Sequence, residues 1–100
     1  MEKKEIIEGN RLIAEFMGLR IGVDKYSYRV GATEPLHEKH LDYHKSWDWL
    51  IPVVEKIGNL SKKKNKQLWG NIVFALRLVK KEEIYKEVIE YIKWYNNQPN

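Results

Sequence analysis

The C-terminal part of the chain carries the most regular pattern of apolar and polar positions. Its apolar residues recur every three or four positions: Ile84, Tyr85, Val88, Ile89, Ile92 and Tyr95. This spacing places them on one face of a helix. Glu82 favours the helix start, where acidic side chains stabilise the positive end of the helix dipole, and it lies one turn before Lys86. With Pro99 as a stop signal, the pattern predicts a helix over residues 82–96.

The segment 69–79 is apolar in two different periods. One set alternates as in a strand: Ile72, Phe74, Leu76 and Leu78. The other set fits one face of a helix: Ile72, Ala75, Leu76 and Val79. Because alanine and leucine are strong helix formers, we favour a short, nearly buried helix and keep a strand as the alternative.

The central stripe of apolar residues predicts a helix over residues 46–57, with Ser46 as its N-cap. Its members follow helical spacing: Trp47, Leu50, Ile51, Val54 and Ile57. Trp47 belongs to this stripe, so we expect it to be buried. Pro52 lies beyond the first turn and lacks a backbone N–H, which predicts a kink near Asp48 or a tighter first turn.

A weaker helical pattern near the N-terminus predicts a helix over residues 4–17. Its inward residues are Ile6, Ile13, Phe16 and Met17. Gly18 follows as the C-terminal cap. Asn10 offers an alternative, in which it caps a shorter helix that starts at Arg11.

After Gly18 the apolar period changes to two, which is typical of strands. Residues 19–23 and 26–30 alternate around a turn at Asp24-Lys25 and predict a small β-hairpin, followed by a loop over residues 31–41. An isolated hairpin is marginally stable, so we expect it to pack on the helices. The pattern therefore predicts an α+β fold that is predominantly helical, with about four helices and one short β-hairpin.

Length and composition narrow the class of protein. The chain has 100 residues, which is a common domain size, so we expect residues 1–100 to form a single compact domain. Cysteine is absent, which excludes disulfides and thiol chemistry and fits a reducing compartment. The first residues are too charged for a signal peptide, and no apolar run approaches the ~20 residues of a membrane helix. We expect a cytoplasmic protein with no membrane contact.

The formal net charge of +4 is concentrated in a lysine-rich segment at residues 58–67. Its cations are Lys62, Lys63, Lys64 and Lys66. Basic segments attract phosphates, so nucleic acid is one candidate partner. The segment contains no arginine for bidentate contacts to phosphate or guanine, and we favour a solvated connector between two helices.

Candidate catalytic chemistry is sparse. His37, His40 and His44 would lie on one face if residues 36–45 were helical, as a metal site requires. Pro35 and the lack of an apolar period favour a loop instead, in which that alignment is lost. Without a recognisable nucleophile motif or phosphate-binding loop, we expect a protein that is not an enzyme and needs no cofactor.

The chain is rich in aromatic residues, with four tryptophans and six tyrosines. Trp49, Tyr91 and Trp94 lie at the edges of the helical stripes, where they either complete the core or anchor a protein partner. Trp94 lies beside the terminal stripe, so we expect it to be partly exposed and less important for stability than Trp47.

Three blocks of the sequence, residues 10–18, 43–57 and 84–97, carry a resemblance to a known family. The first reads Asn-Arg-Leu-Ile-Ala-Glu-Phe-Met-Gly, the second contains the Trp-Asp-Trp run, and the third ends in Tyr-Ile-Lys-Trp-Tyr-Asn-Asn. Together they resemble small uncharacterised proteins of phages and prophages of gut bacteria, related to the phage alpha-beta-alpha sandwich domain. The resemblance implies a phage origin and brings no catalytic residues.

These observations leave the molecular function unknown and support three hypotheses. The first is a non-enzymatic, phage-derived accessory protein that acts by contacting another protein or its own copy. The second is a nucleic-acid-binding protein that uses the loop at residues 62–66. The third, and least favoured, is a small metal-dependent enzyme built on the three histidines.

Overall fold

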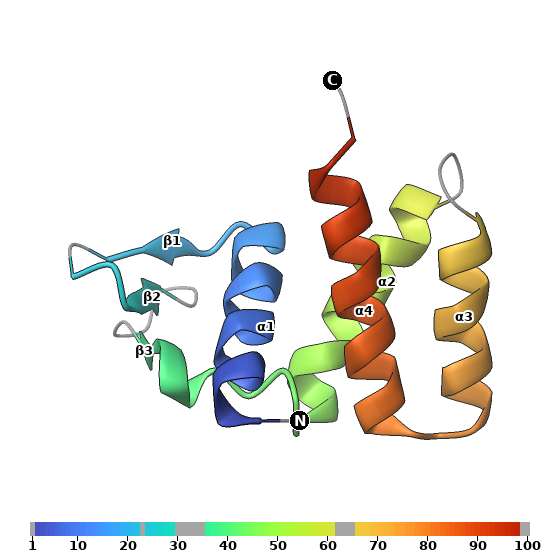
Figure 1. Cartoon of the computed structure of the whole chain (residues 1–100), viewed down its shortest axis with the longest axis horizontal. Helices are drawn as coiled ribbons and strands as arrows, with labels where there is room; N and C mark the ends of the chain where they lie inside the picture. Colours follow the sequence, from blue (N-terminus) through green and yellow to red (C-terminus); the bar gives the residue numbers. More distant parts are fainter. Residues whose placement is uncertain (1, 23, 30–35, 62–65, 99–100) are drawn as a thin grey trace. The chain divides into compact units, whose positions relative to one another are not determined.

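The computed structural model describes residues 2–22, 24–29, 36–61 and 66–98, with only the backbone of Ser61. It divides into two compact units, Met1–Asp42 and Tyr43–Asn100, which are described separately. That they form a single compact domain stays a prediction. Figure 1 shows the helices and strands of each unit.

The first unit begins with helix α1, Lys3–Phe16. It ends in two capping hydrogen bonds, from the Gly18 N–H to the Glu15 carbonyl and from the Leu19 N–H to the Ala14 carbonyl, both 3.0 Å long. Gly18 has a φ of +78°, the left-handed conformation that this cap requires and that glycine adopts without strain. The prediction of Gly18 as the cap is confirmed.

Asn10 lies inside α1 and is buried, so the shorter helix starting at Arg11 is not formed. Its side-chain amide donates a 2.8 Å hydrogen bond to the carbonyl of Leu41. This bond ties α1 to the end of the unit and compensates the cost of burying a polar group.

The predicted hairpin is part of a three-stranded antiparallel sheet. Its strands are β1, Arg20–Ile21, β2, Ser27–Arg29, and β3, Leu36–His37, in that order across the sheet. Tyr28 of the central strand is fully buried, paired with Ile21 on one side and Leu36 on the other. The expectation of a loop over residues 31–41 is wrong where β3 and the short 3₁₀ helix η1, Glu38–His40, form. A strand of two residues is too short to produce an alternating pattern.

The second unit consists of three helices that pack on one another: α2, Trp47–Ser61, α3, Lys66–Arg77, and α4, Lys81–Asn96. The predominantly helical α+β fold is therefore confirmed, and residues 69–77 form helix rather than strand. The expectation that this segment is nearly buried is wrong, because Phe74, Leu78 and Val79 are exposed. The predicted connector at 58–67 overlaps both neighbouring helices, because α2 continues to Ser61 and α3 begins at Lys66. No helix in the described ranges is both long and apolar enough to cross a membrane.

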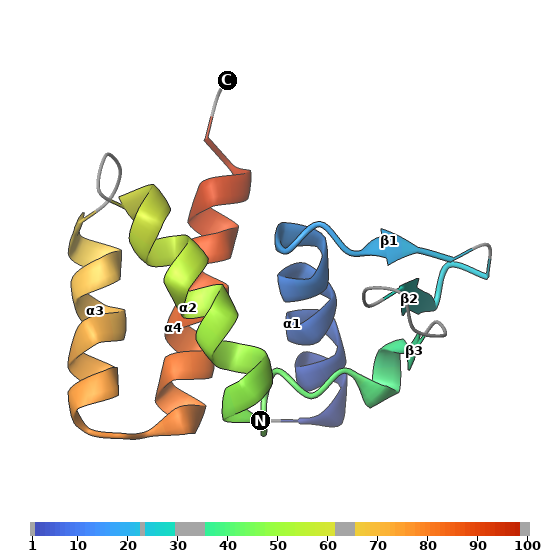
Figure 2. The same ribbon diagram turned by 180° about the vertical axis from the view of Figure 1, so that it is seen from behind.

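The apolar faces of these helices form the core of the second unit. Figure 2 shows the three helices from the side opposite to Figure 1, with α2 in front of α4. The buried apolar residues of this core are Tyr43, Leu50, Val53, Val54, Ile57, Ile72, Ala75, Ile84, Tyr85, Val88, Ile89, Tyr91 and Ile92. On α2 the buried face is shifted relative to the prediction, because Val53 is buried and Ile51 is exposed.

The prediction that Trp47 is buried is wrong, because it is the first residue of α2 and lies half-exposed. The ammonium group of Lys81 lies 5.8 Å from the centre of its ring, a cation–π geometry. Lys81 also donates a 2.7 Å hydrogen bond to the carbonyl of Lys45, so it joins the start of α4 to the start of α2. Trp47 therefore covers a helix junction instead of filling the core.

Candidate functional site

The three aromatic candidates pack against neighbouring rings. Trp49 is half-buried and meets Tyr43 edge to face, with 5.1 Å between the ring centres. Trp94 is half-buried as predicted and lies 5.5 Å from the ring centre of Tyr91. Burial raises the pKa of Tyr43 to about 12.

Tyr91 is fully buried, which favours the first of the two alternatives, a place in the core, over a surface anchor for a partner. It lies on the inward face of α4 with Val88 and Ile92. Burial raises its pKa, and the nearby Tyr95 hydroxyl adds to the shift. Its own hydroxyl has no hydrogen-bond partner among the described residues. These contacts assign Tyr91 to the packing of α4.

The lysine cluster falls mostly outside the described residues. Lys62, Lys63 and Lys64 lie outside the residues that the structure describes. Lys66 is the first residue of α3 and is exposed. The nucleic-acid hypothesis therefore stays a prediction.

The three histidines lie in different local structures. His37 is in β3, accepts a hydrogen bond from the backbone N–H of Lys39 at 3.2 Å, and its ring lies parallel to that of Tyr26. His40 ends η1, and His44 packs edge to face on Tyr85 in the second unit. The helix face that would align all three is not formed, and no three His, Asp or Glu side chains in the described ranges are placed to hold a metal ion.

A polar cluster in the first unit was not predicted from the sequence. The Arg11 Nε–H donates to the Tyr28 hydroxyl at 3.4 Å and lies 3.4 Å from a carboxylate oxygen of Glu38. The hydrogen bond to Tyr28 is the main cause that raises the pKa of Arg11. The cluster joins α1, β2 and η1, and we interpret it as a structural tie.

The second unit has an exposed apolar surface on the outer face of α3, defined here by Gly70, Phe74 and Leu78, and Val79 is exposed directly after it. Phe74, Leu78 and Val79 are large apolar residues with 64%, 49% and 72% of their surface exposed. Phe74 and Leu78 are four residues apart and so lie on the same side of the helix. The buried face of the same helix carries Ile72 and Ala75, so α3 is apolar on two sides.

Two hollows flank Phe74 on this outer face. One has a volume of about 310 Å³ and is lined by Gly70, Val73, Phe74 and Arg77. The other, of about 270 Å³, runs between α3 and α4 and is lined by Asn71, Phe74, Ala75, Leu78, Lys80, Glu83 and Glu87. Phe74 thus stands as an apolar ridge between two depressions, a shape suited to contact with another surface.

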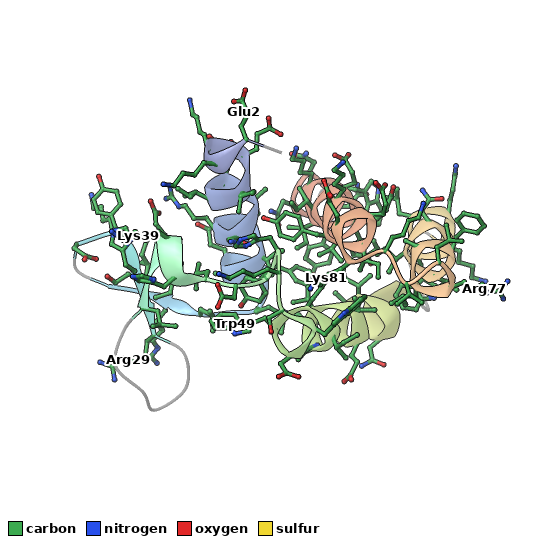
Figure 3. The ribbon with its side chains drawn as sticks, turned by 90° about the horizontal axis from the view of Figure 1, so that it is seen from below. Glu2, Arg29, Lys39, Trp49, Arg77 and Lys81 are labelled. Carbon is green, nitrogen blue, oxygen red and sulfur yellow. The ribbon has the colours of Figure 1, made fainter. Side chains whose placement is uncertain are left out.

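The two hollows are bordered by different charged side chains. Arg77 borders the first hollow, and Figure 3 shows it at the end of α3, pointing away from α4. Lys80, Glu83 and Glu87 border the second. The outer face therefore presents both signs of charge around an apolar centre, as protein interfaces do.

The backbone at the end of α3 is strained at Val79. The Val79 N–H bonds to the Leu76 carbonyl at 3.0 Å and the Lys80 N–H to the Ala75 carbonyl at 3.4 Å, the same cap that ends α1. Here the left-handed position, with a φ of +53°, is occupied by valine, for which this conformation is costly. An exposed apolar residue thus occupies a position that favours glycine.

The sequence contained a signal for this surface. Residues 69–79 fit a strand period and a helix period at once, which means that a helix there is apolar on more than its buried face. Taken together, the two patterns indicate a second, exposed apolar face.

In comparisons with known proteins, the chain matches no protein-family model, no curated protein and no solved structure.

Proposed function

We propose that this chain is a non-enzymatic protein-binding module and that the outer face of α3 is its contact surface. The observation that carries the proposal is the exposure of Phe74 and Leu78 beside two hollows, one lined by Phe74 and the other by both residues. Moving an exposed phenylalanine side chain out of water stabilises a complex by about 1.5–3 kcal/mol. Exposed apolar groups of this kind are typical of protein contact sites when they lie together.

The strained Val79 supports the same proposal. A non-glycine residue in the left-handed region destabilises the chain by about 1–2 kcal/mol, and the exposed side chain recovers little of this by packing. Strain of this kind is concentrated at functional positions. A contact with a partner would give the exposed valine a role.

The proposed contact surface does not include the aromatic residues that the sequence indicated as possible anchors for a protein partner. Trp49 and Trp94 pack on neighbouring rings, and Tyr91 is buried. The resemblance of three sequence blocks to phage and prophage proteins supports a phage-encoded accessory role, and the lack of cysteine fits action in the cytoplasm. We propose both as the setting in which the module acts.

An affinity capture with the full chain tests the proposal. Lysates of gut bacteria are passed over the wild-type chain, over Phe74→Glu and over Tyr26→Glu, a control at an exposed aromatic residue of the first unit. Substitutions at exposed positions change stability by about 0.5 kcal/mol or less, and circular dichroism checks that each variant is folded. We expect specific binding, to another protein or to the chain itself, that Phe74→Glu removes and Tyr26→Glu retains.

Light scattering on the same preparations measures association of the chain with itself. Recovery of no specific protein together with a monomeric mass would refute the proposal. Binding that both variants retain would place the contact surface elsewhere.

A further inference from the structure

We infer that the partner of the outer face of α3 presents a basic amphipathic helix. This helix lies in the groove between α3 and α4, with its apolar side against α3 and its lysine or arginine side chains against α4. The inference rests on the proposed function, because it names the chemistry of the partner that the contact surface binds. Two features of the groove carry it, an apolar wall and an acidic wall.

The apolar wall belongs to α3. The groove is the hollow of about 270 Å³ whose lining comes from both helices, which Figure 1 shows side by side. Phe74 and Leu78 line it and are 64% and 49% exposed. They are four residues apart, which is about 6 Å along the helix. An amphipathic helix repeats its apolar side chains at the same spacing, so it can cover both residues at once.

The acidic wall belongs to α4. Glu83 and Glu87 line the hollow, and Glu90 continues the row, with spacings of four and then three residues along the helix. The Lys86 ammonium lies 3.9 Å from Glu83 and is shared with Glu82, at 3.6 Å. Among the described residues, neither Glu87 nor Glu90 forms an ion pair. Like charges at these spacings repel one another, so a cationic partner stabilises the row.

Two cations near the groove leave this wall acidic. Lys80 lines the same hollow, directly before α4, where it faces the excess of two carboxylates that also line it. Arg77 borders the hollow on the other side of Phe74 and points away from α4 (Figure 3). Along α4 the groove therefore becomes more acidic from Lys80 toward Glu90, and the cations of the partner belong at the Glu87 and Glu90 end.

This distribution of charge decides between classes of partner. A nucleic acid or an acidic peptide would place negative charge beside the carboxylates of Glu87 and Glu90, which weakens binding. The chain as a whole has a formal net charge of +4. Salt screens charges beyond about 8 Å at physiological ionic strength, so a helix in the groove responds mainly to the charges that line it.

Binding of model peptides to the full chain tests the inference. Three helical peptides share one apolar face of leucine, and their polar face is lysine in the first, glutamine in the second and glutamate in the third. Fluorescence anisotropy of the labelled peptides measures each Kd. We expect the lysine peptide to bind most tightly and the glutamate peptide most weakly. Equal affinity for all three, tightest binding of the glutamate peptide, or no binding of the lysine peptide would overturn the inference.

Glu87→Lys assigns the preference to the acidic wall. Glutamate and lysine have similar helix propensities, and a lysine at position 87 follows Glu83 by one turn, so circular dichroism should show a folded chain. We expect this variant to bind the lysine peptide about tenfold more weakly. Glu55→Lys, at an exposed position of α2, makes the same change in net charge and should bind like the wild type. Equal weakening in the two variants would contradict recognition by the groove.

Capture from a bacterial lysate distinguishes failure of this inference from failure of the proposed function. A protein that Phe74→Glu loses and Glu87→Lys retains at the wild-type level contradicts a basic partner and keeps the contact surface. A wild-type dimer that Phe74→Glu dissociates and the lysine peptide does not places a second copy in the groove and also overturns the inference. A monomeric wild type that captures nothing refutes both.

Discussion

At the scale of single residues, backbone conformation distinguishes two similar helix ends. Gly18 and Val79 occupy the same left-handed capping position, at the ends of α1 and α3. Glycine adopts this conformation freely, whereas the branched side chain of valine collides with the neighbouring backbone. The stability of the end of α3 is therefore limited by one residue, which follows Leu78 of the proposed contact surface in the chain.

Val79→Gly should increase the free energy of unfolding by about 1 kcal/mol, because it relieves the strained backbone and removes little buried surface. Urea denaturation of the Phe74→Glu chain, with and without this change, measures the difference. Arg77→Gly is the control. Arg77 is the last residue inside α3, so its replacement by glycine should lower the stability of the chain. A loss of stability in Val79→Gly would show that the valine is not strained.

At the scale of secondary-structure elements, the turn between β1 and β2 depends on one carboxylate. Asp24 accepts hydrogen bonds from the backbone N–H groups of Tyr26 and Ser27 and from the Ser27 hydroxyl, all at 3.0 Å. These bonds, the one from Tyr26 first, lower the pKa of Asp24 because they favour the ionised form. The turn is thus organised by a side chain that is itself exposed.

The lowered pKa predicts a loss of stability in acid. The pKa of Asp24 is lower in the folded chain than in the unfolded one, so its contribution is present above about pH 4 and is lost as the pH falls further. Asp24→Asn should therefore be less stable than the wild type at neutral pH, and this difference should shrink below about pH 4.

Urea denaturation at a series of pH values measures this difference. Ser27→Ala removes one donor and keeps the carboxylate, so part of the pH dependence should persist in it. A difference between wild type and Asp24→Asn that does not change between neutral and acid pH would contradict the role of Asp24.

The helices and strands also show which features of the fold a local sequence pattern can predict. The terminal helix, the Gly18 cap and the hairpin were predictable, because each depends on neighbours in the chain. Helix α4 ends at Asn96, and the Lys86 ammonium nitrogen lies 3.6 Å from a carboxylate oxygen of Glu82, as expected. Strand β3 depends on pairing with β2, which local patterns do not contain.

The positions of side chains were less predictable than the helices that carry them. Trp47 fits the apolar period of α2 but lies at its first residue, where Lys81 from α4 covers its ring. The sequence pattern places Tyr91 at the edge of the apolar stripe of α4, whereas its side chain is buried. Such positions depend on which helix packs against which, and so does the exposure of Phe74 on α3.

At the scale of the whole molecule, the central claim is that the outer face of α3 contacts protein. The second unit buries one side of α3 against α2 and α4 and leaves Phe74, Leu78 and Val79 in water. Keeping apolar groups of this size exposed is unfavourable for a single chain, and a partner that covers them removes that cost.

Photo-crosslinking from position 74 tests this claim most directly. Benzoylphenylalanine, a photoreactive analogue of phenylalanine, replaces Phe74 in one chain and Tyr26 in a matched control, both exposed aromatic residues. On irradiation in a bacterial lysate, we predict a covalent product containing a second protein chain from position 74 and none from position 26. No product from position 74, or equal products from both positions, would contradict the account.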